Sequence, residues 1–116
     1  MSQHSHEPQA ANTHCLEIAV YDVRADALDS FPDRQAAMHA ILQTQPGFMH
    51  GERLRGLSTP TLFADYITWA SREAAESAAA RMPAMPEAGP FMAAIERMRT
   101  FAHLPVTAPT TDVSGP

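Results

Sequence analysis

The sequence predicts an α+β domain of the ferredoxin-like class, a four-stranded antiparallel sheet with helices on one face. Residues 15–105 contain the pattern strand, helix, strand twice, so the order of elements is β-α-β-β-α-β. In the expected strands, successive side chains alternate between two sides with a period of two residues. The two segments between these strands carry apolar residues at helical spacing. Because helices cover one face only, the other face of the sheet needs a partner.

Composition limits the class of protein. The chain has 116 residues, of which 45% are hydrophobic and 18% charged, and one domain is expected at this length. No apolar run approaches the roughly 18 residues that a membrane span needs. A single cysteine, Cys15, allows no intrachain disulfide, and residues 1–13 lack the basic and apolar regions of a secretory signal. The expected location is cytoplasmic, without a membrane partner.

Charge argues against nucleic acid. The net charge is −5, from eight basic and thirteen acidic residues, and every basic side chain besides histidine is a scattered arginine. A nucleic-acid surface needs clustered cations that release phosphate counterions.

Polar and proline-rich ends predict flexible arms on either side of the domain. The expected division is a disordered arm at residues 1–13, the folded domain at 14–106 and a flexible tail at 107–116.

The first strand is expected at residues 15–23, with Leu16, Ile18 and Val20 on one side and Cys15, Ala19, Tyr21 and Val23 on the other. Ser30-Phe-Pro-Asp33 has a helix N-terminus signature, with a capping hydroxyl, a proline and an acid in the first turn. The apolar stripe of that helix is expected at Phe31, Ala37, Met38, Ile41 and Leu42, and Pro46-Gly47 ends it.

The second strand (about residues 48–57) is the most polar, and a hairpin through Gly56 to Pro60 leads into the third (62–69). Ser71-Arg-Glu73 opens the second helix, which the prolines of residues 82–90 interrupt. A short helix is expected to resume at Phe91, with Ile95 and Met98 one and two turns later, and the last strand is expected from Met98 to Val106. The methionine-rich interruption is interpreted either as a lid over a cleft or as core filler.

Three motifs resemble the antibiotic biosynthesis monooxygenase family of the dimeric α+β barrel group. They are the third strand ending in Trp69 with Ser-Arg-Glu-Ala-Ala after it, the Gln45-Pro-Gly-Phe48 turn, and the later Gly-Pro-Phe-Met-Ala-Ala-Ile95. The resemblance covers about residues 14–105 and implies a homodimer with a cleft between sheet and helices in each subunit. It also implies oxidation of quinol-like aromatics with O₂ and no cofactor, although some members degrade haem and many have no established activity.

Haem-degrading members use an Asn on the first strand, a Trp on the third and an axial His on the second helix. By motif, Trp69 holds the Trp position, Tyr21 stands where the Asn would be, and Ile95 replaces the His. Because Ile cannot ligate iron, haem chemistry is disfavoured.

Asp65 is the first candidate catalytic residue, since it shares a side of its strand with Phe63, Ile67 and Trp69. A carboxylate in apolar surroundings suits a general base. The alternative is an ion pair with Arg53 or Arg55 on the neighbouring strand. Glu17 has the same two interpretations, with an Arg of a second subunit as the partner.

His50 and His103 are further candidate bases, because an inward-facing imidazole accepts protons near neutral pH. His39 is expected on a solvated helix face, and Cys15 is expected to be an inert buried thiol. The histidines show no metal-ligand spacing, so no metal site is expected.

Five residues are expected to bind the substrate: Trp69, Tyr21, Phe63, Phe91 and Ile95. Trp69 would stack on a planar substrate or simply pack with its N–H on a backbone acceptor, and Tyr21 would bond a substrate hydroxyl or fill space.

The predicted function is a cofactor-independent monooxygenase that acts on a small aromatic or quinol. A Gly-x-Gly-x-x-Gly loop for a dinucleotide is absent from the sequence, which fits this prediction. The alternative is a non-catalytic, ligand-binding or stress-related barrel protein.

Overall fold

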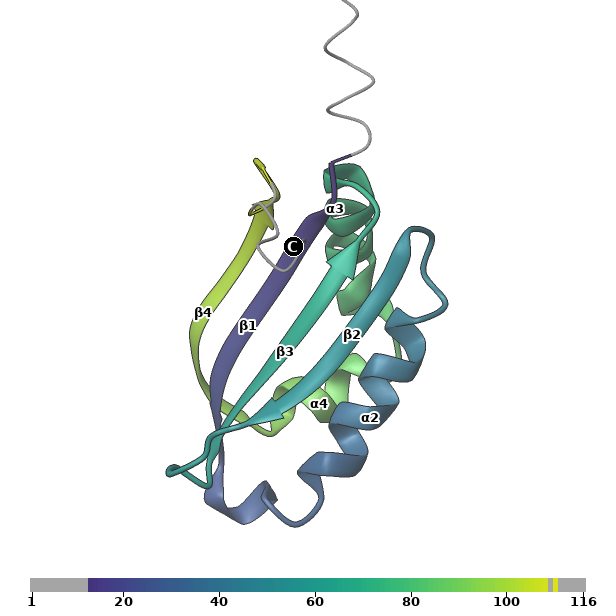
Figure 1. The fold of residues 1–116 in the computed structure, drawn as a ribbon. Coiled ribbons are helices and arrows are strands. Elements are labelled where there is room, and N and C mark those ends of the chain that lie inside the picture. Colours follow the sequence, from purple (N-terminus) through teal and green to yellow (C-terminus); the bar gives the residue numbers. More distant parts are fainter. Residues whose placement is uncertain (1–12, 109, 111–116) are drawn as a thin grey trace, which may run out of the picture.

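The computed structural model describes residues 13–108 and residue 110, and the outer parts of the two predicted arms lie outside the described residues (Figure 1). The elements in chain order are β1 (Cys15–Val23), η2 (Ala25–Ala27), α2 (Phe31–Leu42), β2 (Phe48–Arg55), β3 (Leu62–Trp69), α3 (Arg72–Arg81), η3 (Met82–Ala84), α4 (Ala88–Ala93) and β4 (Ile95–Pro105). The predicted β-α-β-β-α-β order is confirmed, with the second helix broken into α3 and α4.

All four strands form one antiparallel sheet in the order β2-β3-β1-β4. The helices α2, α3 and α4 lie on one face of this sheet, and the described residues place no helix on the other face (Figure 1). This is the ferredoxin-like arrangement that the sequence predicts.

Burial alternates strictly along β1 and β3. In β1 the buried positions are Cys15, Glu17, Ala19, Tyr21 and Val23, which face the helices, whereas the residues between them are half-buried on the open face. The predicted sides of both strands are therefore confirmed. Glu17 and Asp65 face the helices together with the apolar residues, so two carboxyl groups enter the interior from the two central strands.

The buried face of α2 differs from the predicted stripe. Phe31, Gln35, Met38, His39 and Leu42 are buried, which is one helical face at spacings of four, three, one and three residues. Ala37 is exposed, and the solvated position predicted for His39 is wrong. Packing of the two large residues Phe31 and Met38 sets the rotation of the helix, and this rotation carries the polar Gln35 and His39 inward.

The start of α2 also differs in detail. Pro32 lies in the first turn as expected, but the Ser30 hydroxyl makes no capping bond and instead donates to the Ala27 carbonyl oxygen at 3.3 Å. Ser30 has helical dihedral angles, whereas a capping side chain needs an extended backbone. The η2 turn before it leaves the serine in that helical conformation.

Gly47 allows the turn between α2 and β2. Its φ of +87° is in the left-handed region, and a Cβ there would collide with the Cβ of Ala74 on α3. The Gly47 carbonyl accepts a 2.7 Å bond from Ala70 N. This turn therefore ties the start of β2 to the end of β3.

The broken second helix begins as predicted but resumes earlier. Ser71 caps α3 by accepting a bond from Ala74 N, and α4 begins at Ala88 rather than at Phe91. Pro90 fits the first turn of α4, where an amide hydrogen would have no helical partner. The helix stops before Ile95, because Ala94 O accepts from Arg24 N and Ile95 pairs with Val23. The predicted helical position of Ile95 is wrong, because Ile95 begins β4. Met98, where the last strand was expected to begin, lies within β4.

The strand β2 ends at Arg55, slightly before its predicted end, and the hairpin into β3 is confirmed.

Within residues 13–108, no helix has the length and apolar character that crossing a membrane requires.

Candidate functional site

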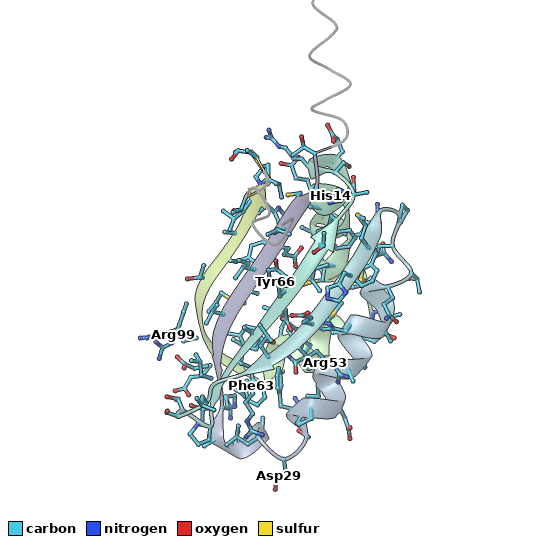
Figure 2. All side chains as sticks on the ribbon, in the orientation of Figure 1. His14, Asp29, Arg53, Phe63, Tyr66 and Arg99 are labelled. Carbon is cyan, nitrogen blue, oxygen red and sulfur yellow. The ribbon has the colours of Figure 1, made fainter. Side chains whose placement is uncertain are left out.

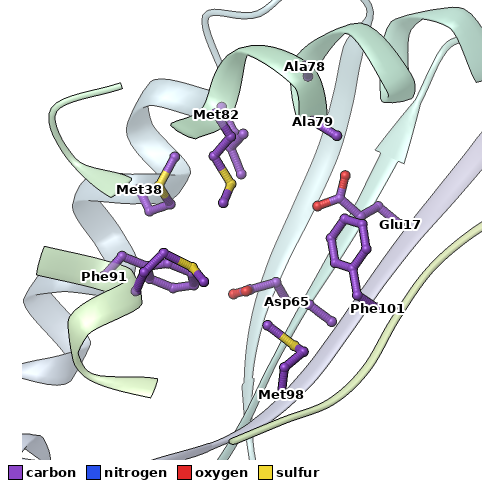
Figure 3. A pocket seen from close by; sticks show the side chains of 12 residues that line it. Glu17, Met38, Asp65, Ala78, Ala79, Met82, Phe91, Met98 and Phe101 are labelled. Atoms are coloured by element: carbon purple, nitrogen blue, oxygen red, sulfur yellow. The ribbon is translucent and has the colours of Figure 1, made fainter. Parts of the chain in front are cut away.

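A cavity of about 340 Å³ lies between the helix-facing side of the sheet and the three helices (Figure 3). Its wall is apolar except for two carboxylates, Glu17 from β1 and Asp65 from β3. The lining residues are Glu17, Ala19, Met38, Leu42, Asp65, Ala78, Ala79, Met82, Phe91, Met92, Met98 and Phe101. This volume is at the lower end of the range of small-molecule sites.

Asp65 meets three side chains and is only 6% exposed. The Tyr21 hydroxyl donates to its Oδ2 at 2.9 Å, and the Gln35 amide donates to its Oδ1 at 2.9 Å. His39 Nε2 lies 2.8 Å from the same Oδ1. Because β3 alternates, Asp65 points toward the helices, and α2 supplies two of its three partners.

The predicted ion pair of Asp65 with an arginine is absent from the contacts of the described residues. Arg53 is the strand partner of Asp65, but its side chain belongs to a different pocket beside α2. The Arg55 guanidinium lies 4.8 Å from the centre of the Phe63 ring. Asp65 is therefore held by neutral donors and one imidazole.

Tyr21 keeps its proton in this arrangement. Burial, followed by the charge of Asp65 and the hydrogen bond to it, raises the pKa of the Tyr21 phenol well above its ordinary value. The ring is fully buried and packs edge to face against Phe31 and Phe91, with distances between ring centres of 5.8 and 5.7 Å. Tyr21 thus acts as a fixed donor to Asp65.

Glu17 is the second carboxylate of the cavity and is 8% exposed. Trp69 Nε1 donates to its Oε1 at 3.1 Å, and His103 Nε2 lies 3.1 Å from the same oxygen. Ala19 pairs with Asp65, so Glu17 is a diagonal neighbour of Asp65 on adjacent strands, a spacing of about 7–8 Å between Cα atoms. Both of these partners lie on the same chain.

The predicted site residues fall into three groups. Asp65 and Phe91 line the cavity. Tyr21, Trp69 and His103 do not line it, and each contacts one of its carboxylates. Trp69 is fully buried, with its ring centre 5.9 Å from that of Phe48. Its N–H donates to a side-chain carboxylate rather than to the predicted backbone acceptor.

The third group lies outside the site. Phe63 packs against Phe31 at 4.8 Å, and Ile95 begins β4 away from the cavity wall. His50 pairs with Thr68 on the open side of the sheet, where its Nε2 lies 2.9 Å from Glu52 Oε2. An inward position at β2 belongs to Gly51, whose partner Ile67 is buried.

Sequence reasoning missed Gln35 and His39 as contacts of Asp65. The signal that could have found them is the spacing 31, 35, 38, 39 and 42 on α2, which places both polar residues on the face of Phe31, Met38 and Leu42.

The rim of the cavity is formed by exposed apolar side chains. Met92, Met98 and Phe101 line the cavity and are each more than a third exposed. From the methionine-rich segment Met82 also lines it, and Met85 packs against the core. Methionine adapts to ligands of different shape.

In the described part of the chain, His, Cys, Asp and Glu side chains form no group of three or more that could hold a metal ion. Cys15 is buried, and burial raises the pKa of its thiol, as expected of an inert cysteine.

Comparison with known proteins identifies the family. The model of the antibiotic biosynthesis monooxygenase family matches residues 15–84, which is more than half of the chain. The chain belongs to the antibiotic biosynthesis monooxygenase family. This confirms the resemblance that the motifs around Trp69 carry. No curated protein matches the chain.

Solved structures share the fold. SnoaB of Streptomyces nogalater, described as a cofactor-independent oxygenase, is 23% identical with a TM-score of 0.68, over 85% of this chain and 96% of SnoaB. A candidate antibiotic biosynthesis monooxygenase of Nitrosomonas europaea is 20% identical with a TM-score of 0.64, over 84% and 94% of the two chains. A protein of unknown function from Bacteroides thetaiotaomicron, described as a possible oxidoreductase, is 10% identical with a TM-score of 0.66, over 82% and 99%.

Proposed function

We propose that this chain is a cofactor-independent oxygenase that acts on a small, electron-rich aromatic or quinol. The observation that carries the proposal is Asp65, a carboxylate in an apolar cavity of ligand size whose partners hold it in place without an arginine. Membership of the family and the description of SnoaB support the reaction class.

Asp65 is the base in the proposed reaction. It takes a proton from a hydroxyl or an activated CH₂ group of the substrate, which leaves a phenolate or carbanion. The anion passes one electron to O₂, and the two radicals combine to a peroxide anion, which takes up one proton to give the hydroperoxide. Loss of water then leaves one oxygen atom in the product ketone or quinone and the other in water, so the substrate supplies all the electrons.

The other predicted site residues position the two carboxylates or form part of the apolar wall of the cavity. Tyr21 orients Asp65 through its hydroxyl, and Trp69 and His103 hold Glu17, which offers the substrate a second acceptor. Phe91 is the aromatic wall against which a planar ring packs. A substrate with two hydroxyl groups satisfies both carboxylates, whose burial would otherwise be costly.

The test compares Asp65→Asn with wild type in O₂ uptake on a panel of anthrones and naphthohydroquinones. Loss of the base is expected to reduce turnover by about 10²–10⁴-fold, with substrate binding and circular dichroism retained. Asp29→Asn, an exposed carboxylate in the loop before α2, is the matched control and keeps full turnover. Full activity of Asp65→Asn ends the assignment.

The alternative is a protein that binds the same class of ligand without turnover, and the apolar wall of the cavity favours ligand binding in either case. Wild-type protein that binds the panel compounds but does not change O₂ uptake supports this alternative.

We also propose that two copies pair through the open face of the sheet and that the protein is cytoplasmic. Support for the pairing comes from the half-buried apolar residues of that face, Leu16, Ile18, Val20 and Tyr66, which no helix covers in the described chain (Figure 2).

A further inference from the structure

We propose that His39 carries the substrate proton from Asp65 to a second, polar pocket, so that the proton leaves the protein by a different route from the one the substrate uses. This inference rests on the proposed function, since it concerns the proton that Asp65 removes. It is carried by the position of His39 between two separate cavities.

The second pocket lies between α2 and the edge strand β2. It has a volume of about 210 Å³ and is lined by Ala36, His39, Ala40, Gln43, Phe48, Gly51 and Arg53. None of these residues lines the substrate cavity. Figure 2 labels Arg53 at this edge of the sheet. His39 therefore lines the second pocket and contacts Asp65, which lines the substrate cavity.

The two sides of the imidazole have different surroundings. Nε2 lies 2.8 Å from Asp65 Oδ1, whereas Nδ1 has no partner in the described protein. Among the described residues, Glu87 Oε1 is the only buried side-chain oxygen or nitrogen without a hydrogen-bond partner. Since His39 Nδ1 makes no hydrogen bond and is not such an atom, it is not buried. Nδ1 is therefore open to solvent, in agreement with the 11% exposure of the His39 side chain.

The remaining partners of Asp65 cannot take the proton. Gln35 presents an amide N–H, which donates only. Tyr21 already carries its proton, and its raised pKa keeps it there. On the side of the substrate, the wall beyond the two carboxylates is Met, Ala, Leu and Phe, which offers no acceptor when a ligand fills the space. His39 is the one contact of Asp65 that can accept a proton and is open to water.

An O–H or C–H bond of the substrate breaks, and an O–H bond forms on Asp65. Nε2 of the imidazole, in the tautomer that carries its proton on Nδ1, takes this proton from Asp65, which restores the carboxylate and leaves an imidazolium. The Nδ1–H of the imidazolium gives its proton to water in the second pocket. When the peroxide anion forms, the same steps run in reverse, and one proton returns from water through His39 and Asp65 to the peroxide. No net proton is released per turnover, because the substrate and O₂ give only the oxidised product and water.

Two charged groups face His39. Asp65 of β3 stabilises the imidazolium, and Arg53 of β2, in the second pocket, favours release of its proton. The neighbours on α2 that share these contacts, Gln35 and Gln43, are neutral.

The test uses His39→Ala with added imidazole. This variant is expected to lose about 10²-fold in turnover, while the affinity for an unreactive naphthol stays within about twofold of wild type. Imidazole restores turnover in a saturable way, and across substituted imidazoles the restored rate follows the basicity of the added compound. Pyrazole, which has the same shape and is a weak base, restores little.

A second variant checks the route. In His39→Ala/Ala40→Leu the leucine reduces the second pocket, and imidazole is expected to restore less turnover. In the control His39→Ala/Ala37→Leu the leucine lies on the exposed side of α2, and imidazole restores as much turnover as in His39→Ala. Equal rescue by pyrazole and imidazole, or no rescue of a folded His39→Ala variant, overturns the inference and leaves His39 a structural residue.

A further readout separates this inference from the proposed function. If wild type oxidises no panel compound, binding of 4-nitrophenol is followed by the phenolate absorption and by an indicator dye that reports proton release. Proton release at least tenfold slower in His39→Ala, restored by imidazole, supports the relay although the oxygenase proposal has failed. Unchanged release, or no ionisation of the phenol, overturns it.

Discussion

Asp65 and Glu17 are two charged side chains in an otherwise apolar wall, and each is accompanied by side chains from neighbouring elements. Burial of an unpaired carboxylate costs several kcal/mol, so these partners are needed for the fold as well as for chemistry. The donors differ in kind. Tyr21 and Trp69 are rigid aromatic donors, whereas the histidines His39 and His103 can also change their protonation state.

Tyr21→Phe tests the donor role at the residue scale. At pH 7 the loss of the hydrogen bond to Asp65 is expected to cost about 1 kcal/mol of unfolding free energy. Above pH 10 the unfolding free energies of wild type and Tyr21→Phe change with pH at different slopes. The folded state holds the phenol proton because its pKa is raised, while the unfolded state loses it near its ordinary value of about 10.

The sign of the slope follows from proton binding. Above pH 10 the unfolded chain binds fewer protons than the folded one, so stability falls as pH rises. The contribution of Tyr21 is complete below pH 10, and above it the unfolding free energy of wild type falls more steeply than that of Tyr21→Phe, by about 1.4 kcal/mol per pH unit. Urea unfolding between pH 9 and pH 11 measures both slopes, and equal slopes for wild type and Tyr21→Phe contradict the prediction.

At the scale of elements, α2 and α3, two of the helices that cover the sheet, begin differently. Ser71 has an extended backbone, and its Oγ accepts a 3.1 Å bond from Ala74 N, whereas Ser30 makes no such bond at the start of α2. Both positions were predicted as helix starts from the same serine signal. The dihedral angles of the serine decide whether its oxygen reaches the free amide groups.

Ser71→Ala is therefore expected to lower the unfolding free energy by about 1 kcal/mol. Ser30→Ala is the matched control and is expected to cost at most a few tenths of that value, because its hydroxyl only donates to Ala27 O. Urea unfolding at pH 7 compares the two variants. A Ser30→Ala cost equal to that of Ser71→Ala would show that the cap assignment is wrong.

At the scale of the whole molecule, the sheet has one face covered by helices and one face open (Figure 1). The open face carries half-buried apolar residues on its central strands, and Leu54 and Leu104 on the outer strands are 45% and 46% exposed. A symmetric pair of sheets buries such a surface, because the same patch meets itself across a twofold axis. The proposed homodimer would cover this face.

Ile18→Glu tests that pairing. Ile18 lies opposite Tyr66 in the middle of the open face, so a charge there is expected to convert a two-chain species into single chains in sedimentation at micromolar concentration. Ala80→Glu on the exposed side of α3 is the matched control and keeps the two-chain species. Wild type that sediments as a well-folded single chain contradicts the proposed dimer.

The sequence by itself determined the order of the elements, the two sides of β1 and β3, and the inward direction of Asp65. These features depend on local periodicity, which the chain carries within a few residues. The family also followed from local motifs, the end of β3 at Trp69 among them.

Only the tertiary structure decided which groups meet across elements. Asp65 contacts His39 and Gln35 instead of Arg53, and Trp69 donates to Glu17, a partner 52 residues away in the chain. The rotation of α2 about its axis follows from how Phe31 and Met38 pack on the sheet, and no local pattern contains that information. The periodicity of a strand shows which side a residue takes, whereas its neighbour across the interior depends on how separate elements pack.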